Sequence, residues 1–331
     1  MKALLLPFAF IWGVINCVRR FLYRISLLQT HHLGSATISV GNLSMGGSGK
    51  TPVSIWIVKF LEENGLVGAV LSRGYKSKLE GSGGVLNDRS QKYSASDYGD
   101  EPLLIFKQTL RSDVFIGQNR IESFSKFKGS SQYDFILLDD GFQHLKIKRD
   151  LNILLVDQSL DFKNFKVAPQ GYLREFPSTF IHADLIILTK GRYSSNRNKE
   201  KYQKFFKLHS IIELDFEITA FENEKGLVST LNDKKIVVIS AIANNPIFLT
   251  EVKKFGKVLD FHFYDDHHHF TLKDVEKIKE KYKEEKVCFV CTEKDYVKLQ
   301  LFSWNDQLFF AKQGLIFLKN KEILIERLLG L

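Results

Sequence analysis

A glycine-rich segment, Ser44-Met-Gly-Gly-Ser-Gly-Lys-Thr51, carries the most specific chemistry in this 331-residue sequence. It follows an apolar run at 36–40 and precedes residues 52–61, whose apolar side chains recur with helical periodicity. Strand, glycine-rich loop and helix in this order bind the phosphates of a nucleoside triphosphate through backbone N–H groups, and the glycines supply positive φ and space. A Gly/Ser turn before a helix is the alternative, and Ser44 stands where the consensus has glycine. The residues expected to contact the nucleotide are Gly46, Gly47, Ser48, Gly49, Lys50 and Thr51, with the Thr51 hydroxyl on Mg²⁺.

A second apolar run, Phe135-Ile-Leu-Leu-Asp-Asp140, ends in two carboxylates. An apolar strand with a terminal Asp is typical of a Walker B strand, whose Asp holds Mg²⁺ directly or through water. An Asp can also end a strand by capping the next element. The Gly-Phe-Gln-His segment that follows, with Gln143 and His144, is more specific than a cap. We therefore expect Asp139, Asp140 or both to bind the metal.

Two other segments could move a proton. In Tyr98-Gly-Asp-Glu-Pro102, Pro102 favours the start of a helix, and Asp100 could cap that helix. Alternatively, Asp100 or Glu101 could accept a proton from a substrate hydroxyl, and composition leaves both roles open. In Asp266-His-His-His269, three histidines suggest a metal. Loop neighbours seldom point at one ion, however, and no Cys or further His lies at ligand spacing. We favour one His that faces a cleft and is oriented by the adjacent Asp.

Two arginines and two cysteines complete the candidates. Arg73 and Arg174 lie in loops where a guanidinium could clamp a phosphate, although surface arginines are common. Cys288 and Cys291 are spaced C-x-x-C inside an apolar run, so they face opposite sides of a strand. We interpret them as buried thiols and not as a metal or redox site.

Apolar runs alternate with amphipathic stretches, which predicts an α/β fold with a mostly parallel sheet flanked by helices, of the P-loop NTPase type. A second, smaller α/β block starts near residue 210. We expect a P-loop domain at 31–212 and a smaller α/β domain with linker strands at 213–331, whose C-terminal segment could return to the first. The expected strands of the first block are 36–40, 67–71, 113–116, 135–138, 152–156 and 185–188, and its helices are 51–64, 103–110, 118–126 and 195–208. Residues 76–99 are expected to be loop.

The N-terminal segment is apolar from Ala3 to Val18, with Arg19, Arg20 and Arg24 after it and no acidic residue before Glu62. The run is shorter than the roughly 20 residues a spanning helix needs. It could pack on the core, but arginines without acids favour a helix in residues 1–30 that lies in a membrane interface.

The formal charge of +9 suits an anionic partner without choosing among nucleotide, nucleic acid and lipid. A nucleic-acid ATPase is one alternative, but a solvated helix face explains the basic stretch 199–207 more simply. A P-loop GTPase, acting as a switch or metallochaperone, is another. Specific recognition of guanine usually needs an Asn/Thr-Lys-x-Asp motif, and the segment Thr189-Lys-Gly-Arg192 has Arg in place of that Asp.

Seven segments together resemble the tetraacyldisaccharide 4'-kinase family of lipid A biosynthesis. The match runs in the family's order over nearly the whole chain, and Ser44 is then a family trait. The segments are Ser39–Pro52, Leu71–Tyr75, Gly99–Pro102, Leu138–His144, Pro169–Glu175, Asp266–His268 and Thr292–Asp295.

The resemblance implies a kinase that transfers the γ-phosphate of ATP, with Mg²⁺, to the 4'-hydroxyl of tetraacyldisaccharide 1-phosphate, giving lipid IVA. It implies a peripheral enzyme on the cytoplasmic face of a Gram-negative inner membrane, with the sugar between the two blocks. No nucleic acid and no obligate protein partner is expected.

The resemblance also implies roles for single residues. Asp100 would activate the hydroxyl and His267 would assist it, although His268 and His269 are adjacent. Arg174 would contact phosphate or developing charge, and Arg73 and Glu101 are further candidates for substrate or phosphate contacts. The nucleotide and metal side would hold Lys50, Thr51, Asp139, Asp140, Gln143 and His144.

Overall fold

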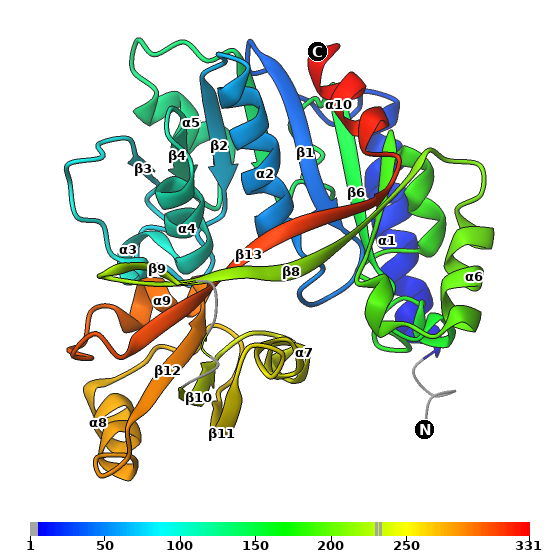
Figure 1. The fold of residues 1–331 in the computed structure, drawn as a ribbon. Helices are drawn as coiled ribbons and strands as arrows, with labels where there is room; N and C mark the ends of the chain where they lie inside the picture. The colour runs from blue at the N-terminus through cyan, green and yellow to red at the C-terminus, as the bar shows by residue number, and fades with distance from the viewer. Residues whose placement is uncertain (1–5, 229–230, 232–233) are drawn as a thin grey trace.

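One mixed sheet runs through the computed structural model, which describes residues 6–228, 231 and 234–331. It has thirteen strands, all parallel to their neighbours except where β13 meets β8, β3 meets β4 and β9 meets β8. The predicted mostly parallel α/β sheet is confirmed (Figure 1). Across the sheet the strands are β11 (Lys257–Phe263), β10 (Lys235–Ser240), β12 (Val287–Thr292), β13 (Leu308–Lys319), β8 (Ile211–Asn223), β7 (Leu185–Thr189), β6 (Leu151–Asp157), β1 (Ala36–Asn42), β5 (Phe135–Asp139), β2 (Gly68–Ser72), β4 (Asp113–Ile116) and β3 (Gly84–Leu86), with β9 (Gly226–Val228) beside β8.

Helices cover both faces of this sheet. They are α1 (Leu6–Arg24), α2 (Lys50–Glu63), α3 (Ala95–Tyr98), α4 (Asp100–Gln108), α5 (Arg120–Phe127), α6 (Asn196–Phe205), α7 (Asn245–Val252), α8 (Leu272–Lys281), α9 (Glu293–Leu299) and α10 (Lys321–Leu329), with 3-10 turns at Phe162–Asn164, Pro177–His182 and Gly191–Tyr193.

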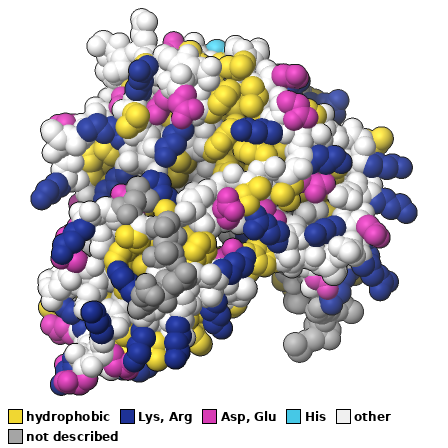
Figure 2. Space-filling model, in the orientation of Figure 1, with side chains coloured by type: hydrophobic (Ala, Val, Ile, Leu, Met, Phe, Trp, Pro, Cys, Tyr) yellow, Lys and Arg dark blue, Asp and Glu magenta, His cyan; other side chains and the backbone are white. Residues whose placement is uncertain are grey.

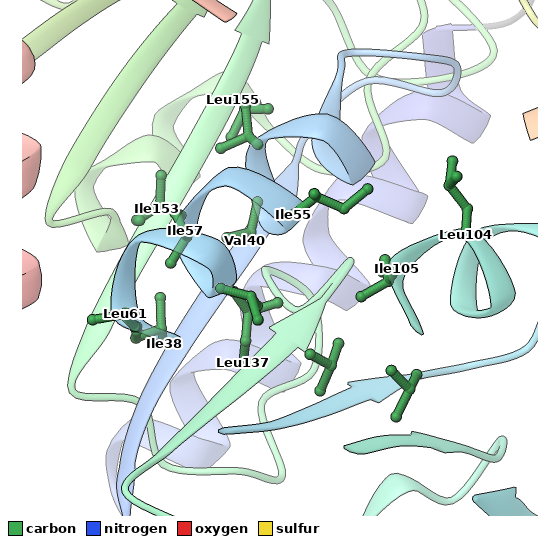
Figure 3. Packing of buried hydrophobic residues seen from close by; sticks show 14 of the residues in the cluster. Ile38, Val40, Ile55, Ile57, Leu61, Leu104, Ile105, Leu137, Ile153 and Leu155 are labelled. Atoms are coloured by element: carbon green, nitrogen blue, oxygen red, sulfur yellow. The ribbon is translucent and has the colours of Figure 1, made fainter. Parts of the chain in front are cut away.

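The main core lies between helices α2 and α4 and the central strands β1, β5 and β6 (Figure 3). Ile57 and Leu61 are one helical turn apart on α2, so they lie on one face of the helix, in the buried cluster that also contains Ile38 and Leu137 of the strands. Each fully buried side chain of this size stabilises the fold by about 1.5–3 kcal/mol. This packing fixes α2, and with it the loop before it, at one edge of the sheet.

The smaller block is an extension of the same sheet. Strands β8 and β13 pair antiparallel over most of their length and connect β10–β12 to the P-loop block (Figure 1). Cys288 packs in a cluster with α7, and Cys291 packs in a cluster with α8, so the two thiols lie on opposite faces of β12 as expected. Burial raises the pKa of Cys288 to about 11, which fits an unreactive thiol.

Two expected elements differ from the structure. Residues 76–99 are not all loop, because Gly84–Leu86 pairs with β4 and Ala95–Tyr98 forms a helical turn. In the second block, the sequence also predicts separate strands at 308–310 and 314–318, but these residues form one strand, in which the register shifts at Lys312/Gln313. For Gly84–Leu86 and for β13, pairing with a distant strand decides the structure, and local composition does not reveal it.

Helix α1 lies along the P-loop block, away from β10–β12 (Figure 1). It buries only Ala9, Gly13 and Arg20, while Phe8 is 66% and Ile15 54% exposed. A Cβ on Gly13 would collide with the Phe176 ring, so glycine permits the close approach. Within the described residues no helix is long and apolar enough to span a bilayer. Figure 2 shows Lys and Arg side chains dispersed over the displayed face and not gathered in a stripe.

Candidate active site

The glycine-rich loop sits at the carboxyl end of β1 and leads into α2. Gly46 and Gly49 have φ of 111° and 86°, in the left-handed region that favours glycine. Gly47 does not adopt positive φ, which corrects the expectation for that residue; a Cβ there would lie an ordinary 3.7 Å from Ala243. At Gly49 a Cβ would collide with the Phe216 ring of β8. The conformation therefore depends on Gly46 and Gly49.

The last residue of β7 and the residue that follows it hold this loop from the other side. The Thr189 hydroxyl donates to the Ser48 carbonyl at 3.0 Å, and the Lys190 ammonium donates to the Gly47 carbonyl. Lys190 also pairs with the buried Asp157 at 2.6 Å. In the sequence, Thr189–Arg192 resembles only an incomplete guanine-binding motif. The signal for its structural role was its position after a buried parallel strand.

Two cationic side chains, Lys50 and Arg174, lie beside Asp140 next to the glycine-rich loop. Lys50 Nζ lies 3.6 Å from Asp140 Oδ1 and 3.3 Å from Asn42 Oδ1, and Arg174 Nη1 donates to Asp140 Oδ2 at 2.9 Å. Burial alone would raise the pKa of Asp140, but Lys50 and Arg174 hold it below its ordinary value. Gln143 joins the group, since its amide donates to the Asn42 carbonyl at 2.8 Å and its oxygen lies 3.4 Å from Arg174.

Asp139, at the end of β5, is buried and 2% exposed. The Ser72 hydroxyl donates to it at 3.1 Å and the Ser54 hydroxyl at 3.5 Å, while Arg120 donates to its backbone carbonyl at 2.6 Å. Burial, with the negative charges of Glu101 and Asp140, raises the pKa of Asp139 to about 6. A cation beside this carboxylate would offset that cost.

The acidic pair fits a magnesium site. Asp140 Oδ1 is buried and, among the described residues, accepts no hydrogen bond, so a lone pair is available. Thr51 lies in the first turn of α2, directly after Lys50. Carboxylate and hydroxyl oxygens are the hard ligands that Mg²⁺ prefers.

Asp100 and His267 meet across the two blocks. Asp100 begins α4 and is 6% exposed, and His267 lies in the loop after β11 with φ of 65°. His267 Nδ1 is 3.2 Å from Asp100 Oδ1. Burial alone would raise the pKa of Asp100, but the His267 hydrogen bond and the charges of Lys294 and Lys298 lower it well below its ordinary value. The carboxylate is therefore ionised, and of the three histidines His267 is the one that contacts it.

His268, next to His267 in the same loop, has other partners. His268 turns to Asp274 at 3.3 Å and stacks on Tyr264. In the described part of the chain no group of three or more His, Cys, Asp or Glu could hold a metal ion.

Three predicted residues have other neighbours. Arg73 is half-exposed and pairs with Glu80 at 2.6 Å, and Glu101 pairs with Lys294 at 3.1 Å. His144 is largely buried; burial and the charge of Arg120 lower its pKa to about 3, so its ring is neutral. None of the three contacts the glycine-rich loop in the hydrogen bonds and ion pairs of the described residues.

Helix α1 is tied to the loops that carry Gln143 and Arg174. Trp12 Nε1 donates to the Arg174 carbonyl at 2.9 Å, and Arg19 donates to the Gln143 carbonyl at 2.8 Å. Arg20 forms a buried ion pair with Glu175 at 2.5 Å. The sequence predicted the helix and the two loops, but not that they touch.

Comparison with known proteins agrees with this geometry. A family model described as tetraacyldisaccharide-1-P 4'-kinase matches residues 1–329. The chain is 32% identical to the tetraacyldisaccharide 4'-kinase of Bdellovibrio bacteriovorus over 95% of this chain and 96% of that protein. It is 33% identical to that of Haemophilus influenzae over 93% and 86%, respectively.

A solved structure extends the match to the fold. LpxK from Aquifex aeolicus, crystallised in complex with ATP, superposes with a TM-score of 0.79 at 28% identity, covering 99% of this chain and 98% of that one. The resemblance seen in the sequence is confirmed, and the GTPase alternative is not favoured. This chain belongs to the tetraacyldisaccharide-1-phosphate 4'-kinase family.

Proposed function

We propose that this chain transfers the γ-phosphate of ATP to the 4'-hydroxyl of tetraacyldisaccharide 1-phosphate, forming lipid IVA. The observation that carries the proposal is Asp140, which brings Lys50 and Arg174 together in front of the glycine-rich loop. Phosphoryl transfer depends on positioning and on cations aimed at the transferring group more than on covalent chemistry.

The nucleotide side has separate roles for its residues. Lys50 binds the β- and γ-phosphates, and Arg174 turns from Asp140 to the transferring phosphate. Thr51, Asp139 and Asp140 would hold Mg²⁺, which supplies charge neutralisation between the phosphates when bound. Gln143 positions Arg174, and His144 supports the loop after β5 that carries Gln143.

On the acceptor side, the Asp100–His267 pair activates the hydroxyl. Asp100 orients the ring through Nδ1 and stabilises the imidazolium that forms, and the second nitrogen, Nε2, takes the hydroxyl proton. The oxygen bonds to the γ-phosphorus, and ADP leaves with the electrons of the broken bond. Glu101 and Arg73 flank the acceptor.

The apolar face of α1 supports a lipid surface as the place of this reaction. Phe8, Ile15 and Phe21 are all more than half exposed, and Arg24 closes the helix. Aromatic and aliphatic side chains enter the acyl boundary while arginines bind lipid phosphate. We place the enzyme on the cytoplasmic face of the inner membrane as a peripheral protein that needs no nucleic acid and no obligate protein partner.

The chain divides, in this proposal, into α1, a kinase domain at 31–212 and a smaller domain at 213–331. Distinct apolar clusters under β10 and β12 support the division. The acceptor sugar enters where α4 of one domain meets α9 of the other.

Transfer of labelled γ-phosphate from Mg-ATP to tetraacyldisaccharide 1-phosphate in mixed micelles tests the function. Lys50→Ala should abolish transfer, and Asp100→Ala should lower kcat by about 10²–10⁴-fold with ATP affinity retained. Hydrolysis of ATP or GTP without transfer to the lipid would refute the proposal.

A further inference from the structure

Lys294, in the first turn of α9, reaches into the contact between the two blocks. Its Nζ lies 3.1 Å from Glu101 Oε1, 3.4 Å from Asp266 Oδ1 and 3.2 Å from His267 Nε2. The side chain is 17% exposed, so three protein acceptors replace most of its water. Lys294 thus contacts both members of the loop pair Asp266–His267 and the α4 carboxylate beside Asp100.

The chemistry of these contacts fixes the position of a proton. An ammonium has three N–H donors and no acceptor, so His267 Nε2 must be the acceptor. The ring proton is then on Nδ1, where it donates to Asp100 Oδ1. Burial alone would lower the pKa of Lys294, but the charges of Glu101, Asp100 and Asp266 raise it above its ordinary value, so the donor is charged.

We propose that Lys294 is a positioning residue that holds His267 in the Nδ1–H tautomer and occupies Nε2 until the acceptor hydroxyl takes its place. The lone pair that the reaction needs is thereby preserved in the enzyme before substrate binds. When the hydroxyl donates to Nε2, the ammonium keeps Glu101 and Asp266 as partners. This inference rests on the proposed role of the Asp100–His267 pair.

Lys298 provides a matched control in the same helix. Its Nζ lies 3.6 Å from Asp100 Oδ2 and 3.2 Å from Asp295 Oδ1, and it donates to the His268 carbonyl at 3.1 Å. It has the same charge and lies somewhat closer to Asp100 than Lys294, whose Nζ is 4.0 Å from Asp100 Oδ2. Among the contacts of the described residues, however, only Lys294 and not Lys298 reaches the His267 ring. Removing Lys298 should change the electrostatic field at Asp100 without changing the tautomer of His267.

Several charged or titratable groups surround His267 and its partners. They come from four elements, and any pH profile reports all of them together. They are Asp100 and Glu101 of α4, Tyr75 after β2, Asp266 directly before His267, and Lys294 and Lys298 of α9.

The experiment is nitrogen-15 NMR of histidine-labelled enzyme in micelles, with His267→Gln to assign the signal. The wild-type chain and Lys298→Met should show an unprotonated Nε2 and a protonated Nδ1. Lys294→Met should lose this pattern, and Lys294→Arg, which keeps N–H donors, should restore it. We also expect Lys294→Met to lower kcat at least tenfold and to change the shape of its pH profile, with a smaller change for Lys294→Arg.

An unchanged tautomer and pH profile in Lys294→Met would overturn the inference. Full kcat in Asp100→Ala and His267→Gln, with the tautomer still dependent on Lys294, would instead refute the catalytic role of the pair and leave the contact as a structural one. The two failures are therefore distinguishable.

Discussion

Replacing Arg20 by Met should destabilise the chain far more than a surface ion-pair variant would. Arg20 and Glu175 are 7% and 1% exposed, their ion pair measures 2.5 Å, and the guanidinium lies 4.9 Å from the Phe142 ring centre. Glu175 Oε1 has no hydrogen-bond partner among the described residues, so Arg20 is the group that stabilises this buried carboxylate. Removing one partner of a buried pair costs about 3–5 kcal/mol, because the other charge stays buried.

The double variant separates this explanation from lost packing. In Arg20→Met/Glu175→Leu no charge remains, so its cost should fall below the sum of the two single variants by about 0.5–3 kcal/mol. Urea unfolding in detergent would be followed by circular dichroism for the whole chain. The fluorescence of Trp12, with Trp56 and Trp304 replaced by Phe in the background, would report release of α1.

Single variants that each cost under about 1 kcal/mol and add up to the double variant would refute this reasoning, because such values belong to an exposed pair. A loss of stability seen only in the Trp12 fluorescence would show that α1 detaches locally. The measured free energy would then describe docking of this helix and not unfolding of the whole chain.

Other variants test the remaining contacts. Trp12→Phe, which removes one N–H donor to the Arg174 carbonyl, should lower kcat up to about tenfold, since such a bond is worth about 0.5–1.5 kcal/mol; kcat and vesicle binding measured together would show whether only catalysis changes. The Glu293 carboxylate accepts a hydrogen bond from Gln108, and burial raises its pKa to about 7. The folded chain therefore binds the carboxyl proton of Glu293 more tightly than the unfolded chain does, and the folded state loses stability as pH rises from about 4.5 to 7. Glu293→Gln should flatten that decline by up to about 3 kcal/mol in unfolding measured against pH, and an unchanged slope would contradict it. Gly49→Ala should abolish ATP binding by calorimetry, because it forces both a strained φ and a clash with β8, and retained binding would show that the loop can adapt.

The sequence predicted those parts of the site that are contiguous in the chain. The glycine-rich loop and Asp139–Asp140 each combine a strand and its chemistry within a few residues, so periodicity and motif agree. The pairing of Asp100 with His267 spans 167 residues and followed from family resemblance alone. Its geometry required the structure.

Residues that act through tertiary position were missed. Arg120 reaches the backbone carbonyl of Asp139 from the start of α5, and Lys190 reaches the Gly47 carbonyl. A lone basic residue after a strand or at a helix start is common, so its type and spacing carry little signal. Lys294 lay inside a segment that the resemblance included, but only the coordinates showed its three acceptors.

The acceptor side that we propose for the site lies where the two blocks touch. Asp100 and Glu101 belong to α4, whereas His267, Lys294 and Lys298 belong to the smaller block. If the blocks separated, Asp100 would lose its hydrogen bond to His267 and both nearby ammonium groups, and these are what keep its buried carboxylate ionised. Contact between the blocks therefore sets both the burial of Asp100 and the partners that keep it ionised, and in the proposed mechanism it brings the ring of His267, which takes the proton, to this carboxylate. The long β8–β13 pair, which joins the blocks, keeps these groups within reach of each other.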